Sequence, residues 1–212
     1  MQVWHVKELG SAPVLVNISP PAPVKGEIVV QVEAVGLNFA DTLAIQGKYQ
    51  VRHPFPYVPG MELSGVVLSR GPDTDGPSPG TRVLATCPAG ALAQQVVLPA
   101  GRLVPIPDSM GFAEAAGFPI AYGTSHLALT HTARLQAGET LFVTGAAGGV
   151  GLTAVEIGKR LGASDTAIRT VRLLAQHRRL PALPDIARAL SRLVDEDTKT
   201  LRATVTSAGP LS

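Results

Sequence analysis

The stretch that decides the fold is Leu141-Phe-Val-Thr-Gly145-Ala-Ala-Gly148-Gly149-Val-Gly151-Leu152, in which a short apolar run leads into a glycine-rich corner. Residues 141–143 predict a parallel strand buried on both faces, and the apolar spacing that resumes at Val150 predicts a helix. In such a strand, turn and helix unit, the unpaired N–H groups at the helix start can bind a pyrophosphate. The stretch therefore predicts a nucleotide site, with a tight turn that binds no ligand as the alternative.

The absence of one residue type after the glycine corner bears on which nucleotide could bind there. No lysine follows Gly151 where a P-loop requires one to reach the phosphates, which disfavours ATP or GTP hydrolysis of that type. A dinucleotide fits the spacing better.

Length and composition set the broad class. The 212 residues can hold one full domain and part of a second, and 45% of them are hydrophobic. No apolar run approaches the roughly 20 residues of a membrane span, and the first residues lack the basic and apolar blocks of a secretory signal, so we expect a cytoplasmic protein without a membrane partner. The net charge of +2 is too small to indicate a nucleic-acid surface. Cys87 is the only cysteine, which excludes an internal disulfide, and we expect it to be a small semi-buried residue.

Residues 1 to about 110 are rich in valine, proline and glycine and predict a β-rich barrel or sandwich. Helices are expected over 112–117 and 123–132. The expected strands cover residues 14–18, 28–35, 65–68, 82–85 and 94–98.

Several motifs in a fixed order resemble a known family. They are Val24-Lys-Gly-Glu-Ile-Val-Val-Gln-Val-Glu-Ala-Val-Gly36-Leu-Asn38-Phe-Ala-Asp41, Pro59-Gly-Met-Glu62-Leu-Ser-Gly65, Ala115-Ala-Gly-Phe, Tyr122-Gly-Thr124 and the glycine corner, residues 145–151. Together they resemble the medium-chain dehydrogenase/reductase superfamily, and within it the zinc-independent quinone oxidoreductase branch that includes zeta-crystallin. The resemblance covers residues 1 to about 163.

The resemblance implies an α/β fold with a β-rich N-terminal part. A GroES-like β-barrel over 1–120 would be followed by a partial Rossmann-type domain over 121–163, with NADPH between them. The same resemblance suggests a cofactor site and a substrate mouth; Asn38 and Thr124 would contact the nicotinamide end, Gly148, Gly149, Val150 and Gly151 would hold the pyrophosphate, and Tyr49 would line the mouth. The alternatives are a turn-capping amide for Asn38, a helix-start cap for Thr124 and a half-buried surface aromatic for Tyr49.

The resemblance also bears on metal and on chemistry. Zinc-dependent relatives place a cysteine where this chain has Leu37-Asn38 and a histidine where it has Met61, so we expect no metal site. His126 and His131 are five residues apart, which predicts that they lie off one helical face. Without a Lewis acid, hydride transfer from NADPH suits a quinone or an α,β-unsaturated carbonyl, since conjugation delocalises the negative charge. No side chain is indicated as the proton donor.

The resemblance stops after Ala163. Arg169 and Arg172 interrupt the expected second buried strand, and residues 164–212 predict a divergent, mostly helical segment. We therefore expect a truncated, spliced or frame-altered relative, with a homodimer possible if the nucleotide domain is complete enough. The alternative to an oxidoreductase is a catalytically incompetent member of the family that acts, if at all, as a binding or interaction module.

Overall fold

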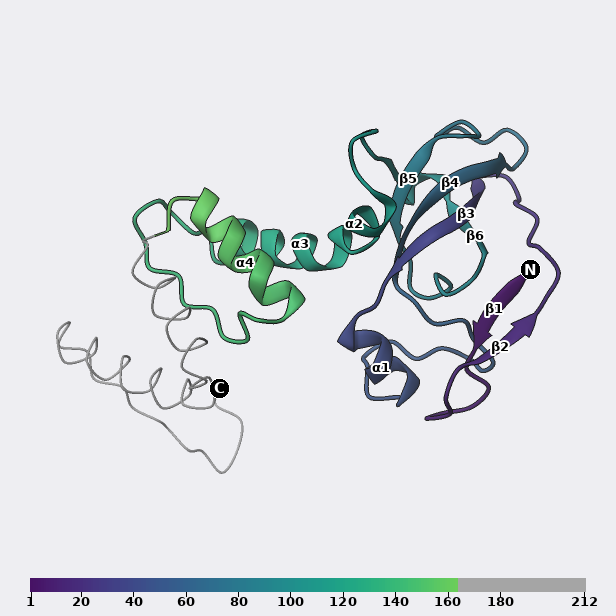
Figure 1. The fold of residues 1–212 in the computed structure, drawn as a ribbon, viewed down its shortest axis with the longest axis horizontal. Coiled ribbons are helices and arrows are strands. Elements are labelled where there is room, and N and C mark those ends of the chain that lie inside the picture. Colours follow the sequence, from purple (N-terminus) through teal and green to yellow (C-terminus); the bar gives the residue numbers. More distant parts are fainter. Residues whose placement is uncertain (164–212) are drawn as a thin grey trace, which may run out of the picture. The chain divides into compact units, whose positions relative to one another are not determined.

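The computed structural model describes residues 1–163, and the predictions for 164–212 lie outside the described residues. The chain divides into two compact units, Met1–Ala133 and a second that starts at Arg134. Figure 1 shows the strands in the first unit and α4 (Gly149–Arg160) in the second. The expected domain boundaries at 120 and 163 stay predictions.

The first unit is built on a five-stranded antiparallel sheet in the order β6-β3-β4-β5-β7, accompanied by a two-stranded sheet of β1 and β2. All five predicted strands are confirmed, whereas β1 and β7 were not expected. Both unexpected strands are short and are recognisable only through the partners with which they pair. The strands are β1 (Gln2–His5), β2 (Val14–Asn17), β3 (Glu27–Gly36), β4 (Glu62–Arg70), β5 (Arg82–Thr86), β6 (Gln95–Pro99) and β7 (Leu103–Pro105).

The core of the first unit lies between these strands. Ile28 and Val30 on β3 are fully buried, and they join Leu63 and Val67 on β4 and Val83 on β5 in one apolar cluster. Ile28 and Val30 on β3, and Leu63 and Val67 on β4, lie an even number of residues apart, so the pleat sends the members of each pair to the same face of the sheet. Burial of β-branched and leucine side chains at these positions therefore holds the sheet in register.

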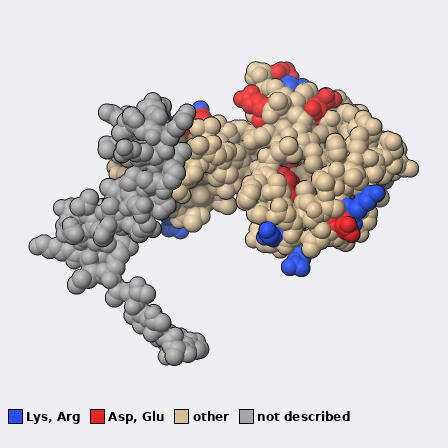
Figure 2. Space-filling model, turned by 60° about the horizontal axis from the view of Figure 1, so that its bottom comes forward, with Lys and Arg blue, Asp and Glu red and all other residues tan. Residues whose placement is uncertain are grey.

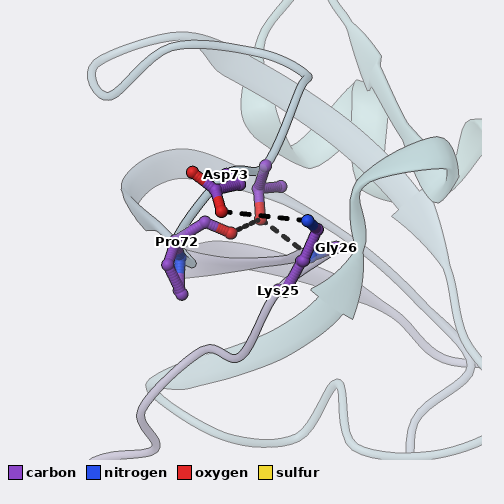
Figure 3. Close-up of polar contacts among 5 residues, drawn as sticks. Lys25, Gly26, Pro72 and Asp73 are labelled. Atoms are coloured by element: carbon purple, nitrogen blue, oxygen red, sulfur yellow. Dashed lines mark hydrogen bonds and ion pairs between the residues drawn. The ribbon is translucent and has the colours of Figure 1, made fainter.

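A loop beyond the sheet closes over the turn that precedes β3. The Thr74 hydroxyl accepts a hydrogen bond from the Gly26 N–H at 2.8 Å and donates one to the Pro72 carbonyl at 3.2 Å, as drawn in Figure 3. Lys25 and Asp73 form an ion pair at 3.8 Å beside it, with both side chains largely exposed. The exposed pair adds little stability, so the buried threonine is the main tie between the two turns.

Four helical segments complete the first unit beside the short turn η1 (Ala100–Arg102). They are α1 (Phe39–Ile45), α2 (Phe112–Ala116), α3 (Phe118–His126) and η2 (Leu127–Thr132). The helix expected over 112–117 is confirmed as α2, which packs against β3 and β4 (Figure 1). The helix expected over 123–132 begins earlier, at Phe118, because a proline is accepted in the first turn of a helix.

The last segment corrects the prediction for the two histidines. Residues Leu127–Thr132 form a π-helix rather than an α-helix. Because a π-helix pairs each residue with the fifth along, His126 and His131 lie on the same face, with ring centroids 6.3 Å apart in an edge-on arrangement. The prediction that they lie off one helical face was therefore wrong.

In the second unit the helix after the glycine corner is confirmed as α4, but the strand predicted over residues 141–143 is wrong. These residues form no strand, and Phe142 is 36% exposed. A strand exists only beside a hydrogen-bonded neighbour, and no segment within residues 1–163 pairs with this run. An apolar run alone was therefore not sufficient to make a strand.

Candidate functional site

The glycine corner is a closed turn that leads directly into α4. Gly145 has a φ of +66°, which side chains rarely adopt, and its carbonyl accepts a hydrogen bond from the Gly148 N–H at 2.9 Å. A Cβ on Gly151 would lie 2.7 Å from the Gly145 carbonyl carbon and 2.8 Å from the Ala146 Cα. Glycine at 145 and 151 is therefore required for the turn to fold back onto the first turn of the helix.

The outer surface of this corner can accept an anion. Gly148 and Gly149 are exposed, Val150 is 41% exposed, and all three lie at the N-terminal end of α4. The helix dipole and the first N–H groups favour negative charge at this end. The Gly148 N–H donates to the Gly145 carbonyl within the turn and is therefore not available to a phosphate. Gly148 could still let a phosphate approach its backbone closely, because it has no side chain. The pyrophosphate roles of Gly148, Gly149, Val150 and Gly151 stay predictions.

In the first unit a buried carboxylate joins three segments that are distant in sequence. Glu62, the first residue of β4, is 2% exposed. It accepts a hydrogen bond from the Asn38 Nδ2 at 2.8 Å and another from the Ile120 N–H, in the first turn of α3, also at 2.8 Å. Asn38 is the residue at which α1 begins, so the end of β3, the start of α1 and the start of α3 meet at Glu62.

Sequence reasoning assigned no role to Glu62, although a signal was present. A single glutamate at the head of the apolar run Leu63-Ser-Gly-Val-Val must enter the core with the strand, and buried carboxylates are nearly always hydrogen-bonded. The alternative for Asn38, a turn-capping amide, is confirmed, because its side chain forms a capping box with Asp41 at the start of α1. The same side chain also donates a hydrogen bond from Nδ2 to Glu62. Its proposed contact with the nicotinamide end stays a prediction.

Thr124 and Tyr49 occupy different surroundings. Thr124 lies four residues after Ile120 on α3, and therefore on the same side of that helix, and its side chain is exposed. The helix-start alternative for Thr124 was wrong, because α3 starts at Phe118. Tyr49 lies in a bend after α1 and is half-buried, as its alternative described. Its role at a substrate mouth stays a prediction.

Two further acidic groups near Asn38 have displaced pKa values. Burial raises the pKa of Asp41, whose Oδ2 accepts the Asn38 N–H at 2.8 Å, and that bond acts in the opposite direction. Burial also raises the pKa of Tyr57, and the negative charge of Asp41 adds to the effect. Both groups are buried side chains of the first unit.

Cys87 is buried rather than semi-buried as expected, and it donates a weak hydrogen bond to the Gly60 carbonyl at 3.5 Å. Burial raises the pKa of its thiol to about 11, so at neutral pH the group is a protonated thiol and not a nucleophile.

The part of the chain that the structure describes offers few side chains that could together bind a metal ion. Within residues 1–163 no group of three or more histidine, cysteine, aspartate or glutamate side chains could hold a metal ion. Glu62 uses one oxygen for Asn38 and the other for Ile120.

No helix within residues 1–163 is long and apolar enough to cross a membrane. On the face drawn in Figure 2, the charged side chains of the described residues are scattered and of both signs.

Two family models match the chain. Residues 24–108 match the alcohol dehydrogenase GroES-like domain, a range that includes all five strands of the larger sheet and α1. Residues 153–212 match the ATP synthase delta (OSCP) subunit, and of these the structure describes only the part within α4 and its end.

Similar proteins extend the first match. Quinone oxidoreductase-like protein 2 of Bos taurus is 41% identical over 146 residues, which are 68% of this chain and 42% of the bovine protein. The synaptic vesicle membrane protein VAT-1 homolog of Homo sapiens is 39% identical over 139 residues, 66% of this chain and 35% of that protein. The solved quinone oxidoreductase of Thermus thermophilus, also solved in complex with NADPH, is 40% identical with a TM-score of 0.69, covering 77% of this chain and 51% of that protein.

The GroES-like sheet followed by a glycine corner and helix defines the class as an α/β protein with a partial Rossmann-type nucleotide-binding part. The GroES-like domain and the similarity to these relatives support the medium-chain dehydrogenase/reductase superfamily, in its zinc-independent quinone oxidoreductase branch. It spans about half the length, or less, of the relatives that it matches.

Proposed function

We infer that the chain binds NADPH at the glycine corner and acts as an oxidoreductase that delivers hydride to a quinone or an α,β-unsaturated carbonyl. The observation that carries this proposal is the exposed face of the corner at the start of α4. A Cβ on Gly148 would meet only the Gly145 carbonyl oxygen, at 3.4 Å, and would point into space that a phosphate needs. The NADPH complex of the Thermus relative supports the choice of cofactor.

NADPH supplies the hydride when it is bound. The residues of the chain hold and orient it: the first turn of α4 faces the pyrophosphate, and Asn38 and Thr124 contact the nicotinamide end, with Tyr49 at the substrate mouth. Both oxygens of Glu62 already accept hydrogen bonds, which makes this carboxylate a poor metal ligand. A substrate that spreads its own negative charge is therefore favoured over a simple ketone. The proton comes from water. We place this reaction in the cytoplasm and allow for a homodimer.

Binding and turnover are tested separately. Excess NADPH should raise the melting temperature of the purified chain, as expected for any ligand that binds only the folded state. Gly148→Ala should reduce NADPH affinity at least about tenfold without a change in α-helical content, because φ at this position is −82° and the added methyl group fits the turn. Gly123→Ala, on α3 with no heavy atom within 4 Å of the added Cβ, is the matched control.

Catalysis is then measured with a panel of small quinones and enones by the loss of the nicotinamide absorbance. A chain that binds NADPH but oxidises none of it is a nucleotide-binding or interaction module, the second candidate. The absence of a strand over residues 141–143 favours this second candidate, since a Rossmann-type sheet begins with that strand. A melting temperature indifferent to NADPH contradicts the proposed cofactor site and favours a catalytically incompetent chain that acts, if at all, through interaction.

A further inference from the structure

The π-helix Leu127–Thr132 brings two imidazole side chains onto one face. Its backbone pairs residues five apart, and the Ala133 N–H donates to the Ala128 carbonyl at 2.8 Å. His126 and His131 have the same spacing, both side chains are exposed, and their ring centroids lie 6.3 Å apart. In an α-helix, residues five apart would lie about 140° apart around the helix axis. The two rings therefore meet only in the wider helix.

Local contacts support this form of the helix. The Thr130 hydroxyl donates to the His126 carbonyl at 2.6 Å, which gives this carbonyl a donor inside the widened turn. Leu129 is 6% exposed, so the buried side of the segment differs from the side that carries the histidines. π-Helices are rare and are frequently found at functional sites. Because both rings are exposed, a solute can reach them.

Two imidazoles at this separation can bind a single divalent cation. A neutral imidazole is a ligand for zinc, copper and nickel ions through one ring nitrogen. A ring nitrogen lies about 1.1 Å from the ring centre and a Zn–N bond is about 2.1 Å long, so two rings on one tetrahedral zinc ion have centroids about 5 Å apart. The observed 6.3 Å has to shorten by about 1 Å, which exposed side chains reach by small rotations about χ1 and χ2.

The cation would have two protein ligands. Within residues 1–163 no group of three or more histidine, cysteine, aspartate or glutamate side chains could hold a metal ion, so water completes the coordination sphere. Structural and catalytic zinc ions take three or four protein ligands. The histidine pair is therefore a weaker, reversible site, and the hydride transfer proposed above does not depend on it.

We propose that His126 and His131 form a binding site for a divalent cation of the zinc, copper and nickel class, and that the bound ion holds Leu127–Thr132 in its π-helical form. A ligand shifts an equilibrium toward the conformation that binds it better, and only the π-helix presents both rings to one ion. This segment is the last helix before the boundary of the first unit at Ala133, so the ion fixes the end of that unit.

Calorimetric titration of the purified chain with zinc chloride tests the site. We expect a dissociation constant below about 0.1 mM, with the ring resonances of both histidines shifting together in NMR spectra. His126→Ala and His131→Ala should each weaken zinc binding at least about tenfold, and the double variant should lose little more, because either change alone breaks the chelate. Both changes replace an exposed side chain by the best helix former, so the fold should persist. His5→Ala, at the end of β1, is the matched control and should bind zinc like the wild type.

Hydrogen exchange tests the effect on the helix. The Ala133 N–H closes a five-residue hydrogen bond to Ala128, so its exchange reports on opening of the π-helix. At a zinc concentration about ten times the dissociation constant, this exchange should slow by about tenfold in the wild type, because each opening must first release the ion. Zinc should leave the exchange unchanged in the double variant.

The outcomes separate the two halves of the proposal. Single variants that bind zinc within about threefold of the wild type overturn the site, as do losses that add in the double variant like those of two independent ligands. Exchange at Ala133 that ignores saturating zinc overturns the hold on the helix. None of these measurements involves NADPH, so the proposed function stands or fails by its own melting experiment.

Discussion

Replacing Gly36 by alanine should destabilise the first unit by an amount that the local geometry sets. The added Cβ would lie 2.6 Å from the Glu62 Cδ and 2.6 Å from the Ala116 carbonyl oxygen, both closer than any ordinary contact. Glu62 is held by Asn38 and Ile120, and Ala116 belongs to the backbone of α2, so neither neighbour can move freely.

The expected loss combines overpacking with weakened hydrogen bonds. Inserting a methyl group into a well-packed site costs about 1–3 kcal/mol, and each displaced hydrogen bond costs about 1 kcal/mol more. We expect Gly36→Ala to lower the free energy of unfolding by about 2–4 kcal/mol, or the melting temperature by about 4 °C for each kcal/mol.

The assay uses the only tryptophan, Trp4, which lies on β1 in the first unit. Its fluorescence during urea unfolding therefore reports on the first unit rather than on α4. Gly123→Ala is the control with the opposite sign, since an exposed alanine within α3 should stabilise by about 0.5–1 kcal/mol. A Gly36→Ala variant within about 0.5 kcal/mol of the wild type would refute the close packing around Glu62.

Three further outcomes follow from burial. Leu63→Ala, at a fully buried position of β4, should cost about 2–5 kcal/mol, against less than about 0.5 kcal/mol for Leu68→Ala at a 43% exposed position of the same strand; equal losses in urea unfolding would contradict the core assignment. Cys87 should react slowly with a thiol reagent in the native state. Burial raises the pKa of Cys87 from 9.0 to about 11, so between these pH values the unfolded chain binds fewer protons than the folded chain. The free energy of unfolding should therefore fall with rising pH across that window, by at most about 1.4 kcal/mol per pH unit. A Cys87→Ala variant with the same pH dependence would show that the Cys87 thiol is not its cause. The Tyr57 hydroxyl is buried with no hydrogen-bond partner within residues 1–163, so Tyr57→Phe should be neutral or stabilising by up to about 1 kcal/mol, and a loss above that would reveal a partner for the hydroxyl.

Local pattern was enough for most elements of the first unit. The run from Ile28 to Val35 is rich in valine, which indicates a strand without any knowledge of its neighbours, and β3 occupies that run. Glycine followed by helical apolar spacing from Val150 indicates a turn and a helix for the same reason, and α4 begins at Gly149. The family motifs also lie within single stretches, so the membership could be predicted without any contact information.

The sequence by itself determined these local elements and the family; the tertiary structure alone decided how they are used. Residues 141–143 are apolar enough for a strand but have no neighbour to pair with within residues 1–163, and His126 and His131 meet only because the helix widens to a π-helix. Glu62 reaches Asn38 across 24 residues and Ile120 across 58, and no local pattern records such a contact. Propensity acts between residues near in sequence, whereas hydrogen bonds and packing are satisfied by whatever the fold brings within reach, and such long-range contacts hold Glu62 between Asn38 and Ile120.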